Sequence, residues 1–238
     1  MADIFHFKQF SIDQTNCAMK VNTDGALLAA LSKGIDKPLS ILDIGTGTGM
    51  IALMLAQKYI SALVHAVEID EQTLNTAKLN FEKSPYFNRI SAFHSPIEEF
   101  WAKTQQKYDL IVSNPPFFIN SLISKNPKKE AARHTDTLFY ERLIFESAKK
   151  LKPSGYIYLI LPVATATLVK NIASKQGLLY VKQEIMIHSF SHSKPHRSIL
   201  VFSFENISPT IKDFVIYEKQ GRYTLEYRTL LKDYLTIF

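Results

Sequence analysis

Between residues 40 and 176, short apolar runs with strand character alternate with runs of helical character. The strand-like runs cover 40–44, 63–67, 89–94, 108–113 and 156–161, and the helical runs cover 50–58, 71–83, 97–103, 139–151 and 165–176. Strands separated by helices in this way form a parallel sheet with helices on both faces. The alternation therefore predicts an α/β fold.

The pattern changes near the end of this region. Two strand-like runs, 181–188 and 198–204, are separated only by the loop 189–197. Such a short connection joins antiparallel strands, because a parallel pair needs a longer crossover. We predict a seven-stranded Rossmann-like methyltransferase sheet, with five parallel strands and a terminal antiparallel hairpin, rather than a dinucleotide-binding sheet. A further strand at 214–218 and a short helix at 225–234 are expected outside it.

Length and composition favour one domain that spans residues 1–238. Residues 39–205 would form the catalytic core, residues 1–38 an N-terminal cover and helix, and residues 206–238 a C-terminal extension. The net charge of +6 modestly favours a polyanionic partner. Cys17 is the single cysteine, so neither an internal disulfide nor a cysteine-based metal site is expected. We recognise no signal peptide or membrane span, and expect a cytoplasmic monomer without a metal.

A glycine-rich turn, DIGTGTG at 43–49, follows the first strand. Glycines let the backbone approach a ligand closely. In a dinucleotide-binding fold such a turn holds a pyrophosphate, which Asp43 would repel. A carboxylate there suits the ammonium group of S-adenosylmethionine, and Glu68 at the end of the second strand is placed to accept ribose hydroxyls. We therefore predict S-adenosylmethionine binding by Asp43, Gly45, Thr46, Gly47, Gly49 and Glu68.

The adenine end of the cofactor is expected beside the third strand. Methyltransferases of this fold often carry an acidic residue there, which accepts a hydrogen bond from the adenine amino group. Ser95 takes that position here, and its hydroxyl can bond without the charge. Ile97 is expected to pack on the adenine face. Because Ser95 stands where an acidic residue is common, we predict weaker cofactor binding.

Residues 114–117 read Asn-Pro-Pro-Phe and follow the fourth strand. An amino group on a purine is a poor nucleophile because its lone pair is conjugated with the ring. The side-chain oxygen of Asn114 and the carbonyl of Pro115 can accept its two N–H groups and direct the lone pair at a methyl group. Pro115 and Pro116 make the elbow rigid, and Phe117 can stack on the base. Asn114 would also lie beside the cofactor.

The chain as a whole resembles the bacterial valine-tRNA adenine-N6 methyltransferases. The resemblance runs through 5–10 (FHFKQF), 17–28 (CAMKVNTDGALL), 43–49, 53–57 (LMLAQ), Glu68, 84–85 (SP), 114–117, 132–134 (ARH), 195–197 (PHR) and 231–238 (LKDYLTIF). It implies methylation of adenosine 37, beside the anticodon of a valine tRNA, and a contact of Thr23 with the cofactor. The family usually has tyrosine at the position of Phe117, and Ser95 is the larger departure.

Basic residues near the expected site predict contacts with the tRNA anticodon stem-loop. The segment 118–137 would be a basic loop directly after the catalytic elbow. Arg133 and Arg197 are the strongest candidates, because arginine clamps phosphate in a bidentate way. The full set of RNA-binding candidates is Lys8, Lys20, Lys128, Lys129, Arg133, His134, His196 and Arg197.

Other substrates fit the same catalytic motif. Enzymes that bear it also methylate guanine N2 in ribosomal RNA and the side-chain amide of glutamine in proteins. The glutamine enzymes carry an N-terminal helical domain, for which the 22 residues before Thr23 are too few. A DNA adenine methyltransferase would need a target-recognition domain that we do not find. An RNA-binding module without catalysis is the non-enzyme alternative; Asn114 and Glu68 argue against it.

Overall fold

The structure, a computed structural model, describes residues 3–15, 17, 19–33, 39–115 and 127–238, and for 127–136 the backbone alone. Nine strands of the described chain form one sheet in the order β11-β10-β8-β9-β7-β6-β3-β4-β5. Their bounds are β3 (Ser40–Ile44), β4 (Leu63–Glu68), β5 (Ile90–His94), β6 (Tyr108–Ser113), β7 (Leu151–Pro162), β8 (Tyr180–Phe190), β9 (Arg197–Ser203), β10 (Thr210–Lys219) and β11 (Arg222–Tyr223).

The predicted α/β sheet is confirmed in its central part. Strands β3 to β7 are mutually parallel, and β8 and β9 form the antiparallel hairpin that completes the order. Two further strands extend these seven. β10, which contains the strand expected at 214–218, pairs in parallel with the far edge of β8, and β11 returns antiparallel to β10, so the described sheet has nine strands rather than seven. The buried side chains of Phe214 and Ile216 hold β10 against the core. The C-terminal extension thus continues the sheet.

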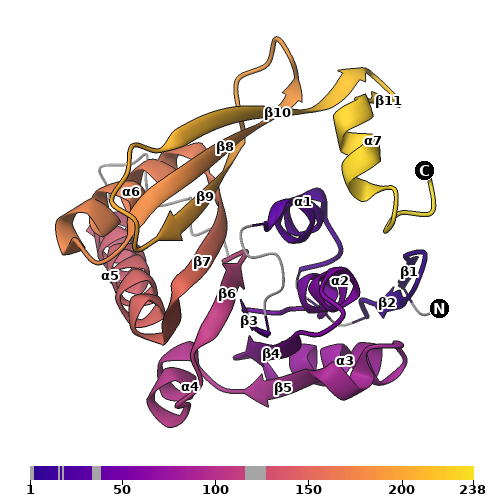
Figure 1. The fold of residues 1–238 in the computed structure, drawn as a ribbon, viewed down its shortest axis with the longest axis horizontal. Coiled ribbons are helices and arrows are strands. Elements are labelled where there is room, and N and C mark those ends of the chain that lie inside the picture. The colour runs from indigo at the N-terminus through magenta and orange to yellow at the C-terminus, as the bar shows by residue number, and fades with distance from the viewer. Residues whose placement is uncertain (1–2, 16, 18, 34–38, 116–126) are drawn as a thin grey trace.

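Helices cover both faces of this sheet, as predicted (Figure 1). One layer contains α1 (Thr23–Leu31), α2 (Met50–Lys58), α3 (Glu71–Glu82) and α7 (Leu225–Leu231), and the other contains α4 (Ile97–Lys103), α5 (Pro127–Lys150) and α6 (Val163–Gln176). A short 3-10 turn, Phe87–Arg89, precedes β5. Successive strand residues point to opposite faces, so Ile41 packs in the first layer and Leu42 in the second.

The two terminal segments pack together at one side of the molecule (Figure 1). Strands β1 (Ile4–His6) and β2 (Ser11–Asp13) form a small antiparallel sheet. Phe7 makes an antiparallel bridge with Leu235 of the C-terminal tail. Asn80 of α3 receives the Asp13 N–H and donates to the Asp13 carbonyl, both at 2.9 Å. These contacts fix the cover to the core.

The basic stretch after the catalytic elbow differs from the prediction. We expected the helix to start at 139, after a loop over 118–137, but α5 begins at Pro127. Proline is well suited to the first helical position, and the alanines at 131 and 132 favour helix. Lys128, Lys129, Arg133 and His134 therefore lie on the first turns of α5. Residues 116–126 lie outside the described part of the chain.

Asp109 anchors the strand ends opposite the expected site. Its carboxylate accepts the N–H groups of Leu39 and Ser40 and pairs with Lys152, all at 2.9 Å. Three neighbouring strands, β3, β6 and β7, are thereby tied together where they begin, and their carboxyl ends share the opposite edge. Within the described residues, no helix is long and apolar enough to cross a membrane, and no cluster of histidine, cysteine or acidic residues could hold a metal.

Candidate active site

The glycine-rich turn and Asn114, the first residue of the Asn-Pro-Pro-Phe motif, meet where the strand order reverses. From β3 the chain continues to β4 and β5 on one side of the sheet, and then returns to β6 on the other side. Open α/β sheets bind ligands at such a switch point, outside the carboxyl ends of the strands. The turn follows β3 and Asn114 follows β6. The Ser113 hydroxyl donates to the Ile44 carbonyl at 2.8 Å and holds the two segments side by side.

The glycines of the turn have two different roles. Gly45, Gly47 and Gly49 all have positive φ, at 70°, 57° and 83°. A Cβ on Gly49 would lie 2.3 Å from the ring of Phe81, so this glycine lets α2 pack against α3. A Cβ on Gly45 or Gly47 would meet no described atom within 4 Å. Those two glycines border open space, as a ligand-binding turn requires.

Asp43 is fully buried beneath the turn. One carboxylate oxygen accepts the Thr46 hydroxyl at 2.6 Å, and Thr46 thereby fixes the side chain. The other oxygen, Oδ1, has no hydrogen-bond partner among the described residues. Burial raises the pKa of Asp43 to about 7, although the Thr46 hydroxyl and the nearby backbone N–H of Ala52 both favour the ionised form. A buried carboxylate with a spare oxygen favours a cationic donor, because a positive group would compensate for its lost hydration.

Glu68 fastens the turn to the end of β4. One of its oxygens accepts the Gly47 N–H at 2.9 Å, and the other accepts the N–H groups of Ile69 and Asp70 at 2.9 and 3.1 Å. A carboxylate has about four acceptor positions. The geometry therefore gives Glu68 a structural role that the sequence did not reveal, and leaves acceptor capacity for about one hydroxyl rather than two.

The remaining cofactor candidates do not all lie together. Ser95 is next to Glu68, whose carbonyl accepts the Ser95 N–H at 3.0 Å, but its hydroxyl donates to the Pro96 carbonyl at 2.8 Å. Ile97 is half-buried and packs in the second helical layer. Thr23 lies at the start of α1 and lines the same pocket as Tyr227. Its proposed contact with the cofactor stays a prediction.

Asn114 is the buried polar group at the end of β6. It is 6% exposed, and its Oδ1 has no partner among the described residues. Its Nδ2 donates to the sulfur of Met19 at 3.7 Å. Pro115 is also buried, while Pro116 and Phe117 lie outside the described residues. Sequence reasoning missed Met19 as a site residue, although it lies in the family-like stretch 17–28. The contact bridges 95 positions, which no local pattern reveals.

The RNA-binding candidates with described side chains are largely engaged within the protein. Lys8 donates to the backbone oxygens of Lys232 and Phe238 at 2.5 and 2.7 Å. Lys20 pairs with Asp3, and Arg197 pairs with Asp24 at 2.6 Å. His196 is exposed as a whole residue, but its ring is partly shielded from water. This shielding, together with the positive charge of Arg197, lowers the pKa of His196. The side chains of Lys128, Lys129, Arg133 and His134 lie outside the description.

Comparison with known proteins gives a consistent set of relatives. The sequence model of the methyltransferase small domain family matches residues 17–169. The chain is 43% identical to a tRNA1(Val) (adenine(37)-N6)-methyltransferase of Pedobacter heparinus, over all of both chains. It is 38% identical to the protein of that name from Parabacteroides distasonis, over 97% of this chain and 96% of the relative.

Solved structures of low sequence identity share the fold. A predicted O-methyltransferase from Agrobacterium tumefaciens superposes with a TM-score of 0.67 at 15% identity, over 89% of this chain and 96% of the other. A methyltransferase from Pyrococcus furiosus superposes with a TM-score of 0.57 at 24% identity, over 82% and 90%. These likenesses concern the Rossmann-like architecture alone.

Proposed function

The chain belongs to the methyltransferase small domain family, and we propose that it transfers a methyl group from S-adenosylmethionine to N6 of adenine in tRNA. The target proposed is adenine 37, beside the anticodon of a valine tRNA, as in the names of the full-length relatives. The observation that carries the proposal is the buried Oδ1 of Asn114 at the switch point, next to the glycine-rich turn, which has no hydrogen-bond partner among the residues that the structure describes.

The residues of the turn fit S-adenosylmethionine. Of the described atoms, none would meet a Cβ on Gly45 or Gly47, and Asp43 Oδ1, which has no hydrogen-bond partner among these residues, suits an ammonium group. Glu68 retains acceptor capacity for a ribose hydroxyl. Ser95 and Ile97 lie at the end of the neighbouring strand β5, where the adenine end is proposed to lie. When bound, the cofactor supplies an electrophilic methyl group on a sulfonium leaving group.

The elbow residues would activate and aim the target amino group. Asn114 Oδ1 and the Pro115 carbonyl accept its two N–H bonds, which draws the nitrogen lone pair out of conjugation. Both residues are buried, so water competes little for these bonds. Pro115 and Pro116 restrict the backbone, and a small displacement of the attacking atom lowers the rate steeply. Phe117 would stack on the base, and the N6 proton leaves as the new N–C bond forms.

The substrate must adapt to this buried site. A base in an anticodon loop is stacked, so adenine 37 has to be splayed out of the loop to reach Asn114. Because tRNA is processed in the cytoplasm, we propose a cytoplasmic location for the chain, and we propose that it acts as a monomer with the anticodon stem-loop as its partner.

The direct test is the identity of the methylated nucleoside. We would incubate the protein with tritiated S-adenosylmethionine and bulk tRNA from a strain without this gene, and digest the product to nucleosides. Label in N6-methyladenosine that disappears with Asn114→Ala is expected. Label in N2-methylguanosine would overturn the adenine target.

A second measurement separates failure of the substrate from failure of the cofactor site. Calorimetry with S-adenosylmethionine is expected to show binding by the wild-type protein and by Asn114→Ala. Cofactor binding without any labelled tRNA would overturn the tRNA substrate and direct the search to ribosomal RNA and glutamine-containing proteins. Absence of cofactor binding would overturn the enzymatic function and favour a non-catalytic RNA-binding module.

A further inference from the structure

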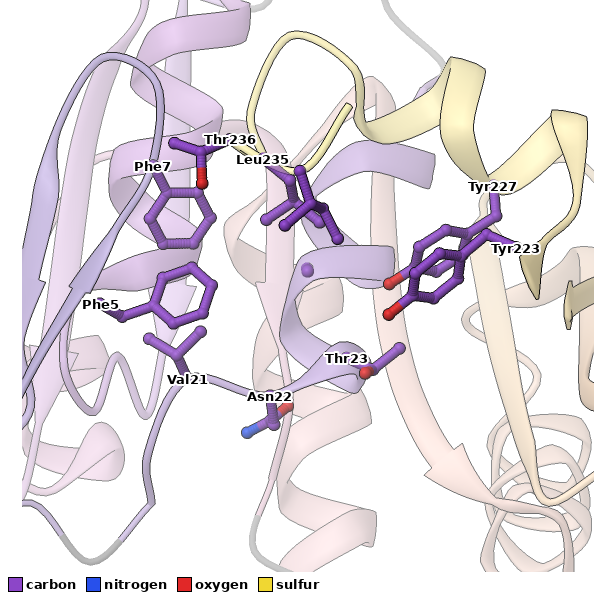
Figure 2. A pocket seen from close by; sticks show the side chains of 11 residues that line it. Phe5, Phe7, Val21, Asn22, Thr23, Tyr223, Tyr227, Leu235 and Thr236 are labelled. Carbon is purple, nitrogen blue, oxygen red and sulfur yellow. The ribbon is translucent and has the colours of Figure 1, made fainter. Parts of the chain in front are cut away.

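A hollow lies between the N-terminal segment, the start of α1 and the C-terminal tail. Its volume is about 250 Å³. Phe5 and Phe7 form one side of it, Tyr223 and Tyr227 form the opposite side, and Leu235 and Thr23 lie between them (Figure 2). None of these six residues carries a role in the chemistry described above, and Thr23 alone was considered for the cofactor.

The walls of this pocket are held in place by backbone contacts. Phe7 and Leu235 form an antiparallel bridge, which joins one wall to the tail. The Lys8 N–H donates to the Tyr234 carbonyl at 2.8 Å, and the Lys8 ammonium binds the backbone oxygens of Lys232 and Phe238. A pocket fixed in this way is preorganised, so little ordering cost remains for a ligand.

The lining combines flat apolar surfaces with hydroxyl groups. Phe5 and Phe7 lie 4.9 Å apart between ring centroids, and Tyr223 stacks on Tyr227 at 4.7 Å with an interplanar angle of 8°. The hydroxyls of both tyrosines point toward the Thr23 side of the pocket (Figure 2). Aromatic surfaces and a few convergent hydrogen-bonding groups suit a planar heterocycle with polar edges, which is the chemistry of a nucleobase.

The pocket is close enough to Asn114 for nucleotides that neighbour the target. Met19 contacts the Asn114 amide, and four residues further on Thr23 lines the pocket. A fully extended chain spans at most 3.6 Å per residue, so the Cα atoms of Met19 and Thr23 are at most about 14 Å apart. A few nucleotides of single-stranded RNA bridge such a distance. The net charge of +6 suits an RNA partner for the chain as a whole.

We propose that this pocket binds an unstacked base of the tRNA anticodon loop other than the target adenine. The inference rests on the proposed function, which it deepens by adding a second base-recognition site on the substrate. A base held there would fix the loop in the splayed conformation that places adenine 37 at Asn114.

The test compares the effect on RNA affinity of filling the pocket with the effect of removing single bases from the RNA. Thr236, an exposed pocket residue on the tail, is replaced in Thr236→Trp, whose indole fills the hollow. An anticodon stem-loop is made with one abasic site at each loop position in turn, and its Kd is measured by fluorescence anisotropy. For the wild-type protein, loss of the pocket base is expected to raise Kd on the order of tenfold. For Thr236→Trp the intact stem-loop already binds about tenfold more weakly, and the same abasic site has no further effect.

Two variants control this experiment. Thr210→Trp makes the same substitution at an exposed threonine on β10 and is expected to behave as the wild type. Phe5→Leu keeps an apolar side chain and removes one aromatic face, so it should show the same coupling in weaker form. It also keeps the test decisive if Thr236→Trp does not fold, which circular dichroism and cofactor binding report.

The alternative outcomes are distinct. A wild-type protein that binds and methylates the stem-loop, without coupling at any loop position, overturns the pocket alone. A wild-type protein that does not bind the stem-loop overturns the proposed function and the pocket together. Unchanged RNA affinity with altered sedimentation of Thr236→Trp would assign the hollow to contacts between copies of the chain, and would also overturn the proposal.

Discussion

The carboxyl ends of β3 and β6, at the centre of the proposed site, and the residues around them use polar groups in opposite ways. At the centre, Asp43 and Asn114 are buried, and each has one oxygen without a partner among the described residues. At the periphery, Lys8, Lys20 and Arg197 carry full charges that already bind other parts of the protein. The first region has hydrogen-bonding capacity to spare, whereas the second uses its capacity for cohesion.

The difference teaches which polar residues are available to a ligand. A buried oxygen without a partner costs free energy that an apolar side chain would not cost, so its presence indicates a group that binds something else. An exposed cation with a partner has no such cost and stabilises the fold modestly. Among the described residues, Gln57, Trp101, Ser147 and Gln176 also have a buried polar atom without a partner, away from this site. An unpaired atom therefore indicates the chemistry only together with its place at the switch point, where Asp43 and Asn114 lie.

Two buried asparagines offer the sharpest comparison: Asn80 on α3 and Asn114 directly after β6. Asn80 has its side-chain groups bonded to Asp13 and Thr48, whereas the Asn114 side-chain oxygen has no partner in the described part of the chain. We expect Asn114→Ala to lower kcat by roughly 100- to 1000-fold, as for loss of one transition-state hydrogen bond. Its stability should be unchanged or slightly higher, because an unpaired buried oxygen is removed.

Asn80→Ala should show the converse behaviour. Loss of its bonds is expected to lower the free energy of unfolding by about 1–3 kcal/mol, because the Asp13 and Thr48 backbone groups lose their partner. Its kcat should stay within several-fold of the wild type. Urea denaturation and steady-state kinetics measure both quantities, and equal losses of kcat in the two variants would remove the distinction.

Asp43 gives the second prediction, because its pKa of about 7 lies near neutrality. Folded Asp43 holds its proton at pH values where the unfolded side chain has lost it, so the free energy of unfolding falls as pH rises from about 4 to 7. For this fully buried group, the fall in the free energy of unfolding over that pH range is on the order of 4 kcal/mol. A cationic ligand prefers the ionised form, so S-adenosylmethionine affinity should rise up to pH 7 and decline again near pH 8, where the ligand's own amine loses its proton.

Asp43→Asn separates this titration from the others. The variant should bind S-adenosylmethionine more weakly, by roughly tenfold, as expected for loss of a charge-assisted hydrogen bond. Its affinity should be flat between pH 5.5 and 7, and its stability should lose the corresponding fall with pH. Calorimetry and urea denaturation over this range measure the two effects. A wild-type affinity independent of pH would exclude ionised Asp43 as the partner of the ammonium group.

The Asp24–Arg197 pair gives the third prediction, because it joins the start of α1 to the start of β9. The two side chains are 16% and 24% exposed and 2.6 Å apart. Asp24→Asn and Arg197→Gln should each lower the free energy of unfolding by about 1–2 kcal/mol, less in combination than the sum. Arg197→Gln should leave the salt dependence of RNA binding unchanged. If Arg197 instead clamps a phosphate of the single-stranded loop, the slope of log Kd against log salt falls by about 0.7.

The sequence predicts local features of this molecule and misses those set by distant partners. Strands β3 to β7 and their helices follow from periodicity within each segment. The pairing of β10 with β8 does not, because nothing in 214–218 specifies which strand edge it completes. The same limit applies to the site. The glycine-rich turn and the Asn-Pro-Pro-Phe motif can each be recognised because each is one continuous stretch of sequence. The contact of Met19 with Asn114 and the hydrogen bond of Glu68 to the turn depend on the folded backbone. Charge placed Lys8 among RNA ligands, whereas its partners lie at the other end of the chain.

Lys8 gives the prediction with the smallest effect. Its ammonium joins the N-terminal cover to the tail, while the Phe7–Leu235 bridge holds the same segments independently. Lys8→Met keeps the aliphatic stem and should change the free energy of unfolding by less than about 1 kcal/mol. Hydrogen exchange at the Tyr234 and Leu235 amides should nevertheless become several-fold faster, because the tail opens more often. Unchanged exchange together with a weaker salt dependence of RNA binding would show that Lys8 contacts the RNA. The contrast between the centre and the periphery would then not hold for this residue.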